Sequence, residues 1–349
     1  MAASPTVLHL LGTSADGGAE TYFLSLVTAL HADGQPTAVA LREHAGREAA
    51  LSAAGIDHKV LGFGSPLDLV TRPAVAGYAR ERDAAVLLAW MNRAAAHSPK
   101  GPWARIGRLG GYYDLKYYKG FDYLVGNTPD IRDWIVGQGF PAGRARCIPN
   151  FAEVDANAAQ SRAALDTPRE APLLLSMGRL HEAKAHDVTL RALTMIPGAF
   201  LWVAGAGPEE AALKGLAEGL GVADRVRWLG WRDDAGALYR AADLCLFPSR
   251  HEPLGNVVIQ AWAYGLPIIA ARAQGPAALI RDGEDGLLVP IDDPESLAAN
   301  ALALLADRRL GERLARAGKA RLAAEFSREA VLPQWRALFD EAGARACAA

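Results

Sequence analysis

The stretch Phe247-Pro-Ser-Arg-His-Glu-Pro-Leu-Gly-Asn-Val-Val-Ile-Gln-Ala-Trp-Ala-Tyr-Gly-Leu-Pro-Ile-Ile-Ala270 predicts a strand, a loop, a helix and a second strand in succession. The apolar residues 244–247 form the first strand, Pro248 ends it, and the polar residues 249–252 form the loop. Apolar side chains then recur at helical spacing, which indicates a helix with one buried face: Val257, Val258, Ala261 and Tyr264. Gly265 stands where a left-handed helix C-cap belongs, so the chain is expected to turn there into the next strand.

The start of this helix suits a negatively charged ligand. The helix is expected to begin at Pro253 or Gly255, and its N-terminus offers free N–H groups and partial positive charge. Gly255 would let an anion approach the backbone closely. Glu252 and Gln260, at positions i and i+8, could hydrogen-bond a polyol at two points. A helix cap and a surface glutamine would give the same pattern, so this stretch alone leaves both interpretations open.

The composition describes a globular protein of two domains. A chain of 349 residues is too long for one ordinary core. Hydrophobic residues make up 51% and charged residues 22%, and the formal net charge is −2. No overall positive field favours nucleic acid, and any basic surface must be local. Cys147, Cys245 and Cys347 are scattered without a C-x-x-C pair, which predicts neither a disulfide framework nor a zinc site and fits a reducing cytoplasm.

The apolar segments bear on membrane contact. Residues 7–11 form a short apolar run with no basic region before it, which predicts a first strand and not a signal peptide. No apolar stretch is long enough to cross a bilayer. Any membrane contact is therefore expected to be peripheral.

Strands alternate with helices along both halves of the chain, which predicts two parallel sheets covered by helices on both faces. The expected strands are residues 6–11, 36–41, 59–61, 84–89, 122–125 and 147–150 in the first half, and 173–177, 200–204, 226–229, 244–247, 267–270 and 287–289 in the second. The expected domains are residues 1–165 and 166–326, followed by residues 327–349 as a helix that packs back toward the first domain. Ligands are expected at the C-terminal ends of the strands, in a cleft between the domains.

The loop after the first strand of the second half carries two cations. Arg179 and Lys184 lie there, just after Gly178. Two cations at one strand end suit a diphosphate, although a pair of solvated surface cations would look the same.

The next two loops contain glycines and a tryptophan. Residues 203–210 begin like a dinucleotide-binding fingerprint, but Glu210 replaces its third glycine and no acid ends the following strand, so NAD binding is excluded. Gly205 and Gly207 instead indicate a tight turn with a ligand near the backbone. Trp231 could border a nucleobase, although packing is the favoured interpretation for the side chain itself.

Candidate binding residues also follow two strands of the first half. Gly17 and Gly18 follow the first strand and permit positive φ and close approach of N–H groups to a phosphate. Asn92 and Arg93 follow the fourth strand, so they are expected to face the cleft.

The segment Trp90–Gly120 interleaves cations and aromatic residues against a single acid, Asp114. Its members are Arg93, Lys100, Arg105, Arg108, Lys116 and Lys119, with Trp103, Tyr112, Tyr113, Tyr117 and Tyr118. This predicts a surface for sugars, phosphates or anionic lipid heads. A solvated rim with core tyrosines is the alternative, and the overall charge argues against nucleic acid.

The histidines indicate no metal site. Neither H-x-x-x-H nor H-E-x-x-H occurs in the chain. His251 is singled out because it stands beside Glu252 at a strand end.

Together these motifs resemble the retaining glycosyltransferases of family 4, which have the GT-B fold. The resemblance covers nearly the whole chain and is strongest over residues 248–260, 263–267 and 283–290. The other motifs fall in the order that this family uses: Gly17-Gly-Ala-Glu20, Ile148-Pro-Asn150, Gly178-Arg-Leu180, Lys184 and Gly205-Ala-Gly-Pro208. The resemblance implies two Rossmann-like α/β domains, the first for the acceptor and the second for a nucleotide sugar.

The resemblance also implies roles for particular residues. Arg179 and Lys184 would bind the diphosphate, and Glu252 the transferred sugar, as the catalytic set. The donor would also contact Gly17, Gly18, Gly178, Gly205, Gly207, Trp231, His251, Leu254, Gly255, Asn256, Val257 and Gln260. The acceptor would contact Asn92, Arg93, His97, Arg105 and Arg108. Gln260 departs from the family, which usually has a second Glu on the ribose hydroxyls, because Gln lacks the carboxylate's strong acceptor pair.

The implied reaction moves a hexose from a UDP- or GDP-sugar to a hydroxyl of a glycan or glycolipid, with net retention. Arg179, Lys184 and the helix N-terminus would stabilise the charge that grows on the departing diphosphate, without a metal or another cofactor. Domain closure would align the acceptor hydroxyl, and no residue is assigned as a base. The expected acceptor is an anionic glycolipid, such as a lipopolysaccharide core, at the cytoplasmic face of the membrane. Nucleic acid is not an expected partner.

Two alternatives stay open. A nucleotide-sugar epimerase shares the two-domain fold, but it needs a paired acid and base and no acceptor surface, which the basic–aromatic segment argues against. The second alternative is a non-catalytic sugar-nucleotide-binding paralogue. It stays open because Gln260 replaces the second Glu that the family usually has.

Overall fold

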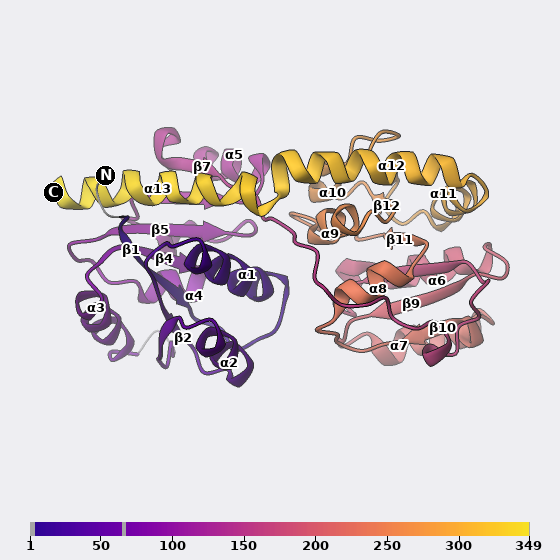
Figure 1. Cartoon of the computed structure of the whole chain (residues 1–349), viewed down its shortest axis with the longest axis horizontal. Coiled ribbons are helices and arrows are strands. Elements are labelled where there is room, and N and C mark those ends of the chain that lie inside the picture. The colour runs from indigo at the N-terminus through magenta and orange to yellow at the C-terminus, as the bar shows by residue number, and fades with distance from the viewer. Residues whose placement is uncertain (1–3, 65–67, 349) are drawn as a thin grey trace. The chain divides into compact units, whose positions relative to one another are not determined.

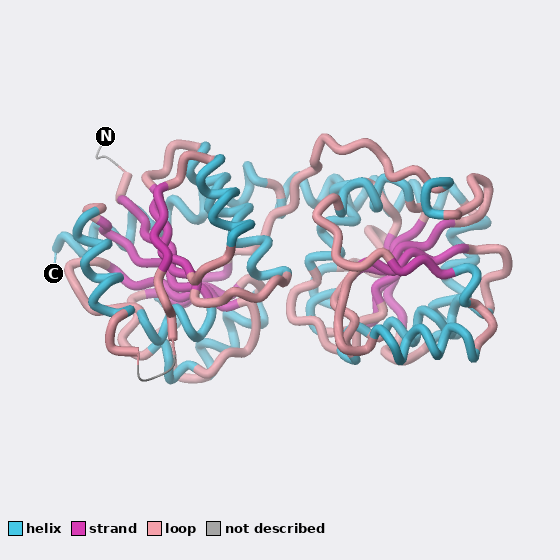
Figure 2. Tube along the Cα trace, turned by 90° about the horizontal axis from the view of Figure 1, so that it is seen from below, coloured by secondary structure: helices cyan, strands magenta, loops and turns pink. Residues whose placement is uncertain are grey.

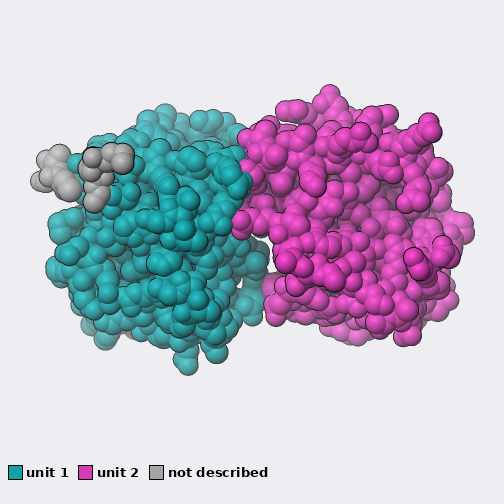
Figure 3. Space-filling view, viewed as in Figure 1, with its two compact units in different colours: residues 1–150, 328–349 teal, residues 151–327 magenta. Residues whose placement is uncertain are grey.

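The computed structural model describes residues 4–64 and 68–348, with side chains up to residue 346, so Cys347 lies outside the described side chains. Its contacts divide the chain into two compact units (Figure 3). Unit 1 is Met1–Asn150 with Arg328–Ala349, and unit 2 is Phe151–Ser327. Residues 151–165 therefore belong to unit 2, earlier than the boundary that the sequence suggested. Arg162 shows why, since it donates to the carbonyl of Ala241 at 2.6 Å and pairs with Asp243 at 2.9 Å.

Unit 1 is built on a parallel sheet of seven strands in the order β3-β2-β1-β4-β5-β6-β7. The strands are β1 Thr6–Leu11, β2 Thr37–Leu41, β3 Asp57–Val60, β4 Ala84–Trp90, β5 Ala104–Leu109, β6 Tyr123–Gly126 and β7 Ala145–Cys147. The helices are α1 Gly18–Ala32, α2 Ala45–Ala53, α3 Thr71–Glu81, α4 Met91–His97, α5 Pro129–Gly137 and α13 Arg328–Ala348. Figures 1 and 2 show the strands running through the middle of the unit with helices around them.

The last helix returns to unit 1. Helix α13 packs on β4 and β5, although it follows the whole of unit 2 in the sequence (Figure 1). The carboxylate of Glu341 accepts the hydroxyl of Tyr123 at 2.9 Å and pairs with Arg146 at 3.0 Å. The core of unit 1 is thus closed by residues from both ends of the chain.

Unit 2 repeats the architecture with a parallel sheet of six strands in the order β10-β9-β8-β11-β12-β13. The strands are β8 Leu173–Met177, β9 Phe200–Ala204, β10 Val226–Trp228, β11 Leu244–Phe247, β12 Ile268–Ala271 and β13 Leu287–Val289. The helices are α6 His186–Thr194, α7 Glu210–Gly219, α8 Ala235–Ala241, α9 Asn256–Tyr264, α10 Gln274–Leu279, α11 Pro294–Ala306 and α12 Arg308–Arg321. Both sheets reverse their strand order beside the first strand of the unit, which is the doubly wound α/β class that the sequence predicts.

One strand of unit 1 was not expected from the sequence. Strand β5, Ala104–Leu109, lies inside the segment that we interpreted as a basic and aromatic surface, and all of its residues are buried. Its register with β4 places Arg105 beside Leu87 and Arg108 beside Trp90. The prediction of an exposed surface is therefore wrong for the middle of Trp90–Gly120. Helices α3 and α4, on either side of β4, were likewise not expected.

Within the described parts of the chain, none of the helices has both the length and the apolar character that crossing a bilayer requires.

Candidate functional site

The loop after β11 and the start of α9 form the centre of the candidate site in unit 2. Gly255 caps α9 at φ 89°, and Gly265 ends it at φ 65°, as the sequence predicts for a left-handed C-cap. The carboxylate oxygen Oε1 of Glu252 accepts the N–H of Gly255 at 3.2 Å. The carbonyl of Glu252 accepts the N–H of Gly275 at 2.7 Å, which fixes the loop against α10. Glu252 is therefore held at the positive end of the helix.

Lys184 reaches the same place from the loop after β8. Its Nζ pairs with Oε2 of Glu252 and lies 5.8 Å from the centre of the Phe247 ring. The Lys184 side chain is only 26% exposed and the Glu252 side chain 12%. Ala185, buried at φ 54°, turns the chain into α6 directly behind the lysine. An ammonium, a carboxylate and a helix N-terminus thus meet at the ends of two neighbouring strands.

Arg179 is the unpaired cation of this loop. Its side chain is exposed, and no described residue forms an ion pair or hydrogen bond with its guanidinium. Arg250, in contrast, pairs with Asp187 at 2.7 Å and with Asp292 at 2.5 Å. Arg250 therefore has a structural partner on each side, whereas Arg179 is available for a ligand.

Gly205 and Gly207, in the loop after β9, pack closely against the backbone of the loop after β8. A Cβ on Gly205 would lie 1.9 Å from the carbonyl oxygen of Gly178, and one on Gly207 would lie 2.2 Å from that of Leu180. The N–H of Leu180 donates to the carbonyl of Ala206 at 3.0 Å, which ties the two loops together. Close packing of two backbones thus requires these glycines, and their expected role beside a ligand backbone remains a prediction.

Trp231, after β10, lies on the surface. It is 49% exposed, and its indole N–H donates to Asp233 at 3.0 Å. The expectation that this side chain packs into the core was wrong, because the strand that precedes it is short and ends at Trp228. The hydrogen bond to Asp233 fixes the indole ring, about half of whose surface is exposed.

Gln260 faces a buried tyrosine. Its Oε1 accepts the hydroxyl of Tyr239 at 3.0 Å, and the Tyr239 ring stacks on Tyr264 with 5.3 Å between centroids. Burial raises the pKa of Tyr239 well above its usual value, so this hydroxyl stays a donor. Among the described residues no hydrogen bond is formed by the amide NH₂ of Gln260, which leaves it for another partner. Gln260 is thus half-buried on α9 and is not a free surface residue.

The remaining donor candidates lie along the same loop. His251 is exposed, Leu254 is buried, and Asn256 and Val257 are the half-buried first residues of α9. The backbone N–H of His251 donates to Ala183 at 3.3 Å, which joins this loop to the loop that carries Lys184.

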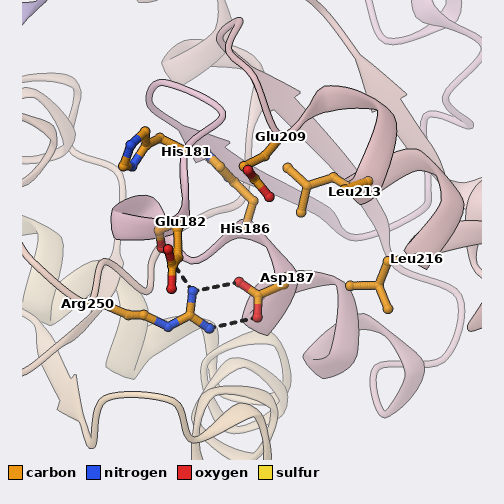
Figure 4. Close-up of a pocket in the computed structure, with 9 residues that line it drawn as sticks. His181, Glu182, His186, Asp187, Glu209, Leu213, Leu216 and Arg250 are labelled. Atoms are coloured by element: carbon orange, nitrogen blue, oxygen red, sulfur yellow. Dashed lines mark hydrogen bonds and ion pairs between the residues drawn. The ribbon is translucent and has the colours of Figure 1, made fainter.

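A recess of about 440 Å³ lies beside this site and not on it. Its side chains come from α6, α7 and the loops before them, and the Arg250–Asp187 pair forms one wall (Figure 4). None of the predicted donor residues lines it. The predicted site is instead an open set of loops at the carboxyl ends of β10, β9, β8 and β11, which are adjacent in the sheet.

In unit 1, Gly17 and Gly18 begin α1. Gly17 is extended at φ 177° and Gly18 is helical, so neither uses the positive φ that glycine permits. A Cβ on Gly17 would lie 2.8 Å from the carboxylate of Glu20. The buried Arg47 donates to the carbonyls of Thr13 at 2.8 Å and of Ala15, which fixes the loop before the helix.

The acceptor candidates of unit 1 divide into two groups. Asn92 and Arg93 lie in the first turn of α4, at the end of β4, as expected. Arg105, Arg108 and His97 are buried. Arg105 donates to the carbonyls of Ser98 and Gly120 and lies over the Phe121 ring, and His97 bonds to the carbonyl of Arg93 at 2.9 Å.

The assignment of Arg105 and His97 to an acceptor surface is therefore corrected. Their polar groups are used inside the fold, because Arg105 lies in the buried strand β5 and His97 is the buried last residue of α4. Arg108 is buried too, but its Nε and Nη1 have no partner among the described residues.

Several residues have features that the sequence did not indicate, although they lie in segments that it singled out. Ser249, in the loop after β11, has a buried hydroxyl without a partner among the described residues. Met91 takes φ +62° at the start of α4, and Tyr113 lies next to it in a recess. Met91 and Tyr113 stand next to or within segments that we had singled out, but only the three-dimensional structure shows strain or a missing partner. In the described part of the chain, no three His, Cys, Asp or Glu side chains converge as metal ligands would.

Comparison with known proteins gives a consistent picture. Residues 171–307 match the model of the family described as glycosyl transferases group 1. The lipopolysaccharide core biosynthesis glycosyltransferase LpsE of Rhizobium meliloti is 39% identical over 320 residues, which are 90% of this chain and 94% of LpsE. LpsD, with the same description and from the same organism, is 34% identical over 97% of this chain and 99% of its own length.

Solved structures share the fold at low sequence identity. Anabaena HepE in complex with UDP-glucose superposes with a TM-score of 0.84 at 19% identity, over 97% of this chain and 100% of HepE. WaaG, described as a glycosyltransferase involved in lipopolysaccharide biosynthesis, gives a TM-score of 0.70 at 18% identity, over 95% of this chain and 99% of WaaG. The two doubly wound sheets therefore form the GT-B fold.

Proposed function

The chain belongs to the group 1 glycosyltransferases, and from that premise we propose that it moves a hexose from a UDP- or GDP-sugar to a hydroxyl of a glycolipid acceptor in lipopolysaccharide core synthesis. The glycosyltransferase activity follows from the family. The donor, the stereochemistry and the acceptor are the parts of the proposal that need a test.

One observation carries the proposal for the donor: in unit 2, an unpaired arginine, a half-buried lysine and a helix start lie at adjacent strand ends. Arg179 has no partner in the described structure, and Lys184 is held at the start of α9 by Glu252. Such a set attracts a group with two or more negative charges, as a diphosphate has. The exposed face of Trp231 supports the same proposal, because a nucleobase attached to that diphosphate needs a flat partner.

The mechanism follows from charge. When the bond between the sugar and the diphosphate breaks, negative charge grows on the phosphate oxygens. Arg179, Lys184 and the N–H groups at the start of α9 would stabilise that charge more strongly in the transition state than in the ground state, which is what accelerates a reaction. We assign Glu252 to the transferred sugar, Gln260 to the ribose, and no residue as a base. The resemblance to retaining enzymes is the reason for proposing net retention.

We assign no metal or other cofactor to this reaction. The proposal rests on the two cations and the helix start, which would meet the diphosphate charge that a divalent metal meets in other transferases.

The acceptor is proposed to bind unit 1, at the end of β4 where Asn92 and Arg93 lie. LpsE and LpsD are described as lipopolysaccharide core enzymes, and their similarity extends over unit 1 as well as unit 2. We therefore propose an anionic glycolipid of the lipopolysaccharide core as acceptor, reached by peripheral contact with the anionic cytoplasmic face of the membrane.

Incubation with UDP- and GDP-sugars tests the function and separates the alternatives. Slow hydrolysis of one donor, with transfer when lipopolysaccharide precursors are added, supports the proposal. Interconversion of the sugar would identify an epimerase, and tight binding without turnover a non-catalytic paralogue. If lipid-free glycans are equally good acceptors, and anionic vesicles neither bind nor activate the protein, the glycolipid part is wrong.

A further inference from the structure

A recess of about 230 Å³ lies at the carboxyl ends of β1 and β4, wholly within unit 1. Its volume is of the order of one sugar ring. Gly12 forms part of its wall beside Trp90, and Tyr113 comes from the loop after β5. A Cβ on Gly12 would lie 3.0 Å from the side chain of Arg93, so only a small residue fits there. The ends of adjacent parallel strands are where this class of fold binds ligands.

Three consecutive residues in the wall of this recess have either a buried polar atom without a described partner or a strained backbone: Trp90, Met91 and Asn92. The indole N–H of Trp90 is fully buried and has no hydrogen-bond partner among the described residues. The Oδ1 of Asn92 is buried and likewise without a described partner. Met91, between them, takes φ +62°, which is strained for a residue with a long side chain. Unpaired donors, unpaired acceptors and strained backbone cluster where proteins bind ligands.

Beside the Trp90 ring lies a buried cation that forms no ion pair with a described carboxylate. The Arg108 guanidinium is 4.9 Å from the centre of the Trp90 ring and 5.2 Å from that of Tyr22. Its Nη2 donates to Oδ1 of Asn150 at 2.6 Å, but Nε and Nη1 have no described partner. The side chain is 1% exposed, and no carboxylate among the described residues forms an ion pair with it.

Burial opposes the charge of Arg108 and lowers its pKa, but a guanidinium stays protonated in proteins. The negative charge of Glu20 raises the Arg108 pKa in part, although no ion pair between the two is found among the described residues. A buried charge that is not compensated by a partner destabilises a fold unless something else supplies that partner. Arg93, exposed at the mouth of the recess, adds a second positive group.

We propose that this recess binds an acidic sugar of the acceptor. The ring would lie against Tyr113 beside Trp90. Because Asn92 Oδ1 and the Trp90 indole N–H are buried in this structure, hydroxyls of the sugar would hydrogen-bond them only after the side chains that line the recess shift. The carboxylate or phosphate of that sugar would be attracted by the positive charges of Arg93 and Arg108. This attraction is stronger at a given distance in a poorly hydrated site than in water. This inference rests on the proposed function only in calling the ligand an acceptor, because the binding itself can be measured without a donor.

The test is saturation-transfer NMR on the full chain without any nucleotide, with D-glucose and D-glucuronate as a matched neutral and anionic pair. We expect glucuronate to bind at least tenfold more tightly than glucose. The Arg108→Met variant, which keeps an unbranched apolar side chain between the rings, should bring the two affinities to within about twofold. Arg80→Met removes one exposed charge from α3 and serves as the control, so it should keep the tenfold preference.

A second variant keeps the test decisive if Arg108→Met does not fold. Asn92→Asp adds a carboxylate to the half-buried first turn of α4, and it should weaken glucuronate more than tenfold while leaving glucose within threefold. Glucose 6-phosphate as a third probe separates a phosphate from a carboxylate preference. Equal binding of glucose and glucuronate by the wild type, or no transfer to either, would overturn the inference. Hydrolysis of the donor in the absence of acceptor reports the proposed function separately, so the two can fail independently.

Discussion

Lys184 and Glu252 form an ion pair between Nζ and Oε2, so the cation that we assign to the diphosphate and the carboxylate that we assign to the sugar are in contact with each other. Glu252 is also fixed by the Gly255 N–H through its other oxygen. The pair keeps the lysine extended toward the helix start, which lowers the cost of ordering it when a donor binds. Arg179 has no such partner and must be ordered by the ligand.

Replacing either cation should slow transfer. We expect Arg179→Ala and Lys184→Ala each to cost about 2–4 kcal/mol of transition-state stabilisation, which is roughly 30- to 1000-fold in kcat/KM. Lys184→Ala also leaves Glu252 without its cation, so it should change the melting temperature more than Arg179→Ala does. Arg191→Ala, an exposed cation on α6, is the control for loss of charge. Near-normal turnover in both variants would place the diphosphate elsewhere.

Gln260→Glu should leave transfer intact or improve it. A carboxylate at this position can still accept the Tyr239 hydroxyl, which Gln260 accepts at 3.0 Å, and it offers a stronger acceptor to ribose hydroxyls. The Michaelis constant for the donor is the measurement, since a ribose contact changes binding first. Tyr239→Phe serves as the companion variant, because it removes only the hydroxyl. Loss of activity in Gln260→Glu would show that the amide NH₂ has a role that an anion cannot fill.

Gly205→Ala should destabilise unit 2. The new methyl would lie 1.9 Å from the carbonyl oxygen of Gly178, at a φ of +147° that suits only glycine. We expect a loss of about 2–4 kcal/mol in the free energy of unfolding, since two loops must separate. Gly215→Ala is the matched control: this glycine is exposed within α7 with nothing within 4 Å of its added Cβ, so it should gain about 0.5–1 kcal/mol. Urea unfolding of all three proteins measures both changes, and equal stability of Gly205→Ala and the wild type would mean that the loops can separate freely.

How far the sequence could predict these features depends on how local their causes are. Helix α9 was predicted with its C-cap Gly265 and with a start at Pro253 or Gly255, because these residues and the apolar spacing all lie within one stretch of chain. Strand β5 was missed because its six residues include Arg105 and Arg108, and two cations in a short segment are also typical of a solvated surface. Only the pairing with β4 and β6 shows that both arginines point into protein.

The glycines of the candidate site show a second limit. Gly205 looked like a residue near a ligand, but its requirement comes from Gly178, a residue distant in sequence. In the same way, the partner of Gln260 is Tyr239 on another helix. The roles of Gly205 and Gln260 thus depend on contacts between elements that are distant in sequence. Sequence patterns alone do not predict which residues make such contacts.

Chelation should leave transfer unchanged if Arg179, Lys184 and the helix start meet the diphosphate charge by themselves. The measurement is the initial rate of donor hydrolysis and of transfer with EDTA and with added Mg²⁺ or Mn²⁺. The three rates should agree within about twofold, a margin that corresponds to about 0.4 kcal/mol. Loss of activity with EDTA, restored by one of the metals, would contradict the assignment of the charge to these groups alone.

His9 should set part of the acid stability of unit 1. It is fully buried in β1 between the rings of Phe23 and Phe339, each at 6.4 Å, and neither ring nitrogen has a described partner. Burial lowers the pKa of His9 from 6.5 to about 3, and the pKa of the buried His186 in unit 2 falls to about 4 for the same reason. Both imidazoles therefore stay neutral in the folded chain where they would be charged in the unfolded one.

The sign of the effect follows from proton binding. Below pH 6.5 the unfolded chain takes up a proton at His9 that the folded chain does not, so stability should fall as the pH is lowered from about 6.5 toward 3. The slope from one such group is at most about 1.4 kcal/mol per pH unit. His9→Leu, which is close to histidine in volume and has no nitrogen to protonate, should flatten this part of the curve and raise stability at pH 7 because two unpaired buried nitrogens are removed. Urea unfolding of the wild type and the variant between pH 4 and 7 measures both effects. An unchanged slope would mean that His186 and the carboxylates set the acid limit, and a variant less stable at pH 7 would mean that the His9 nitrogens have a partner such as bound water.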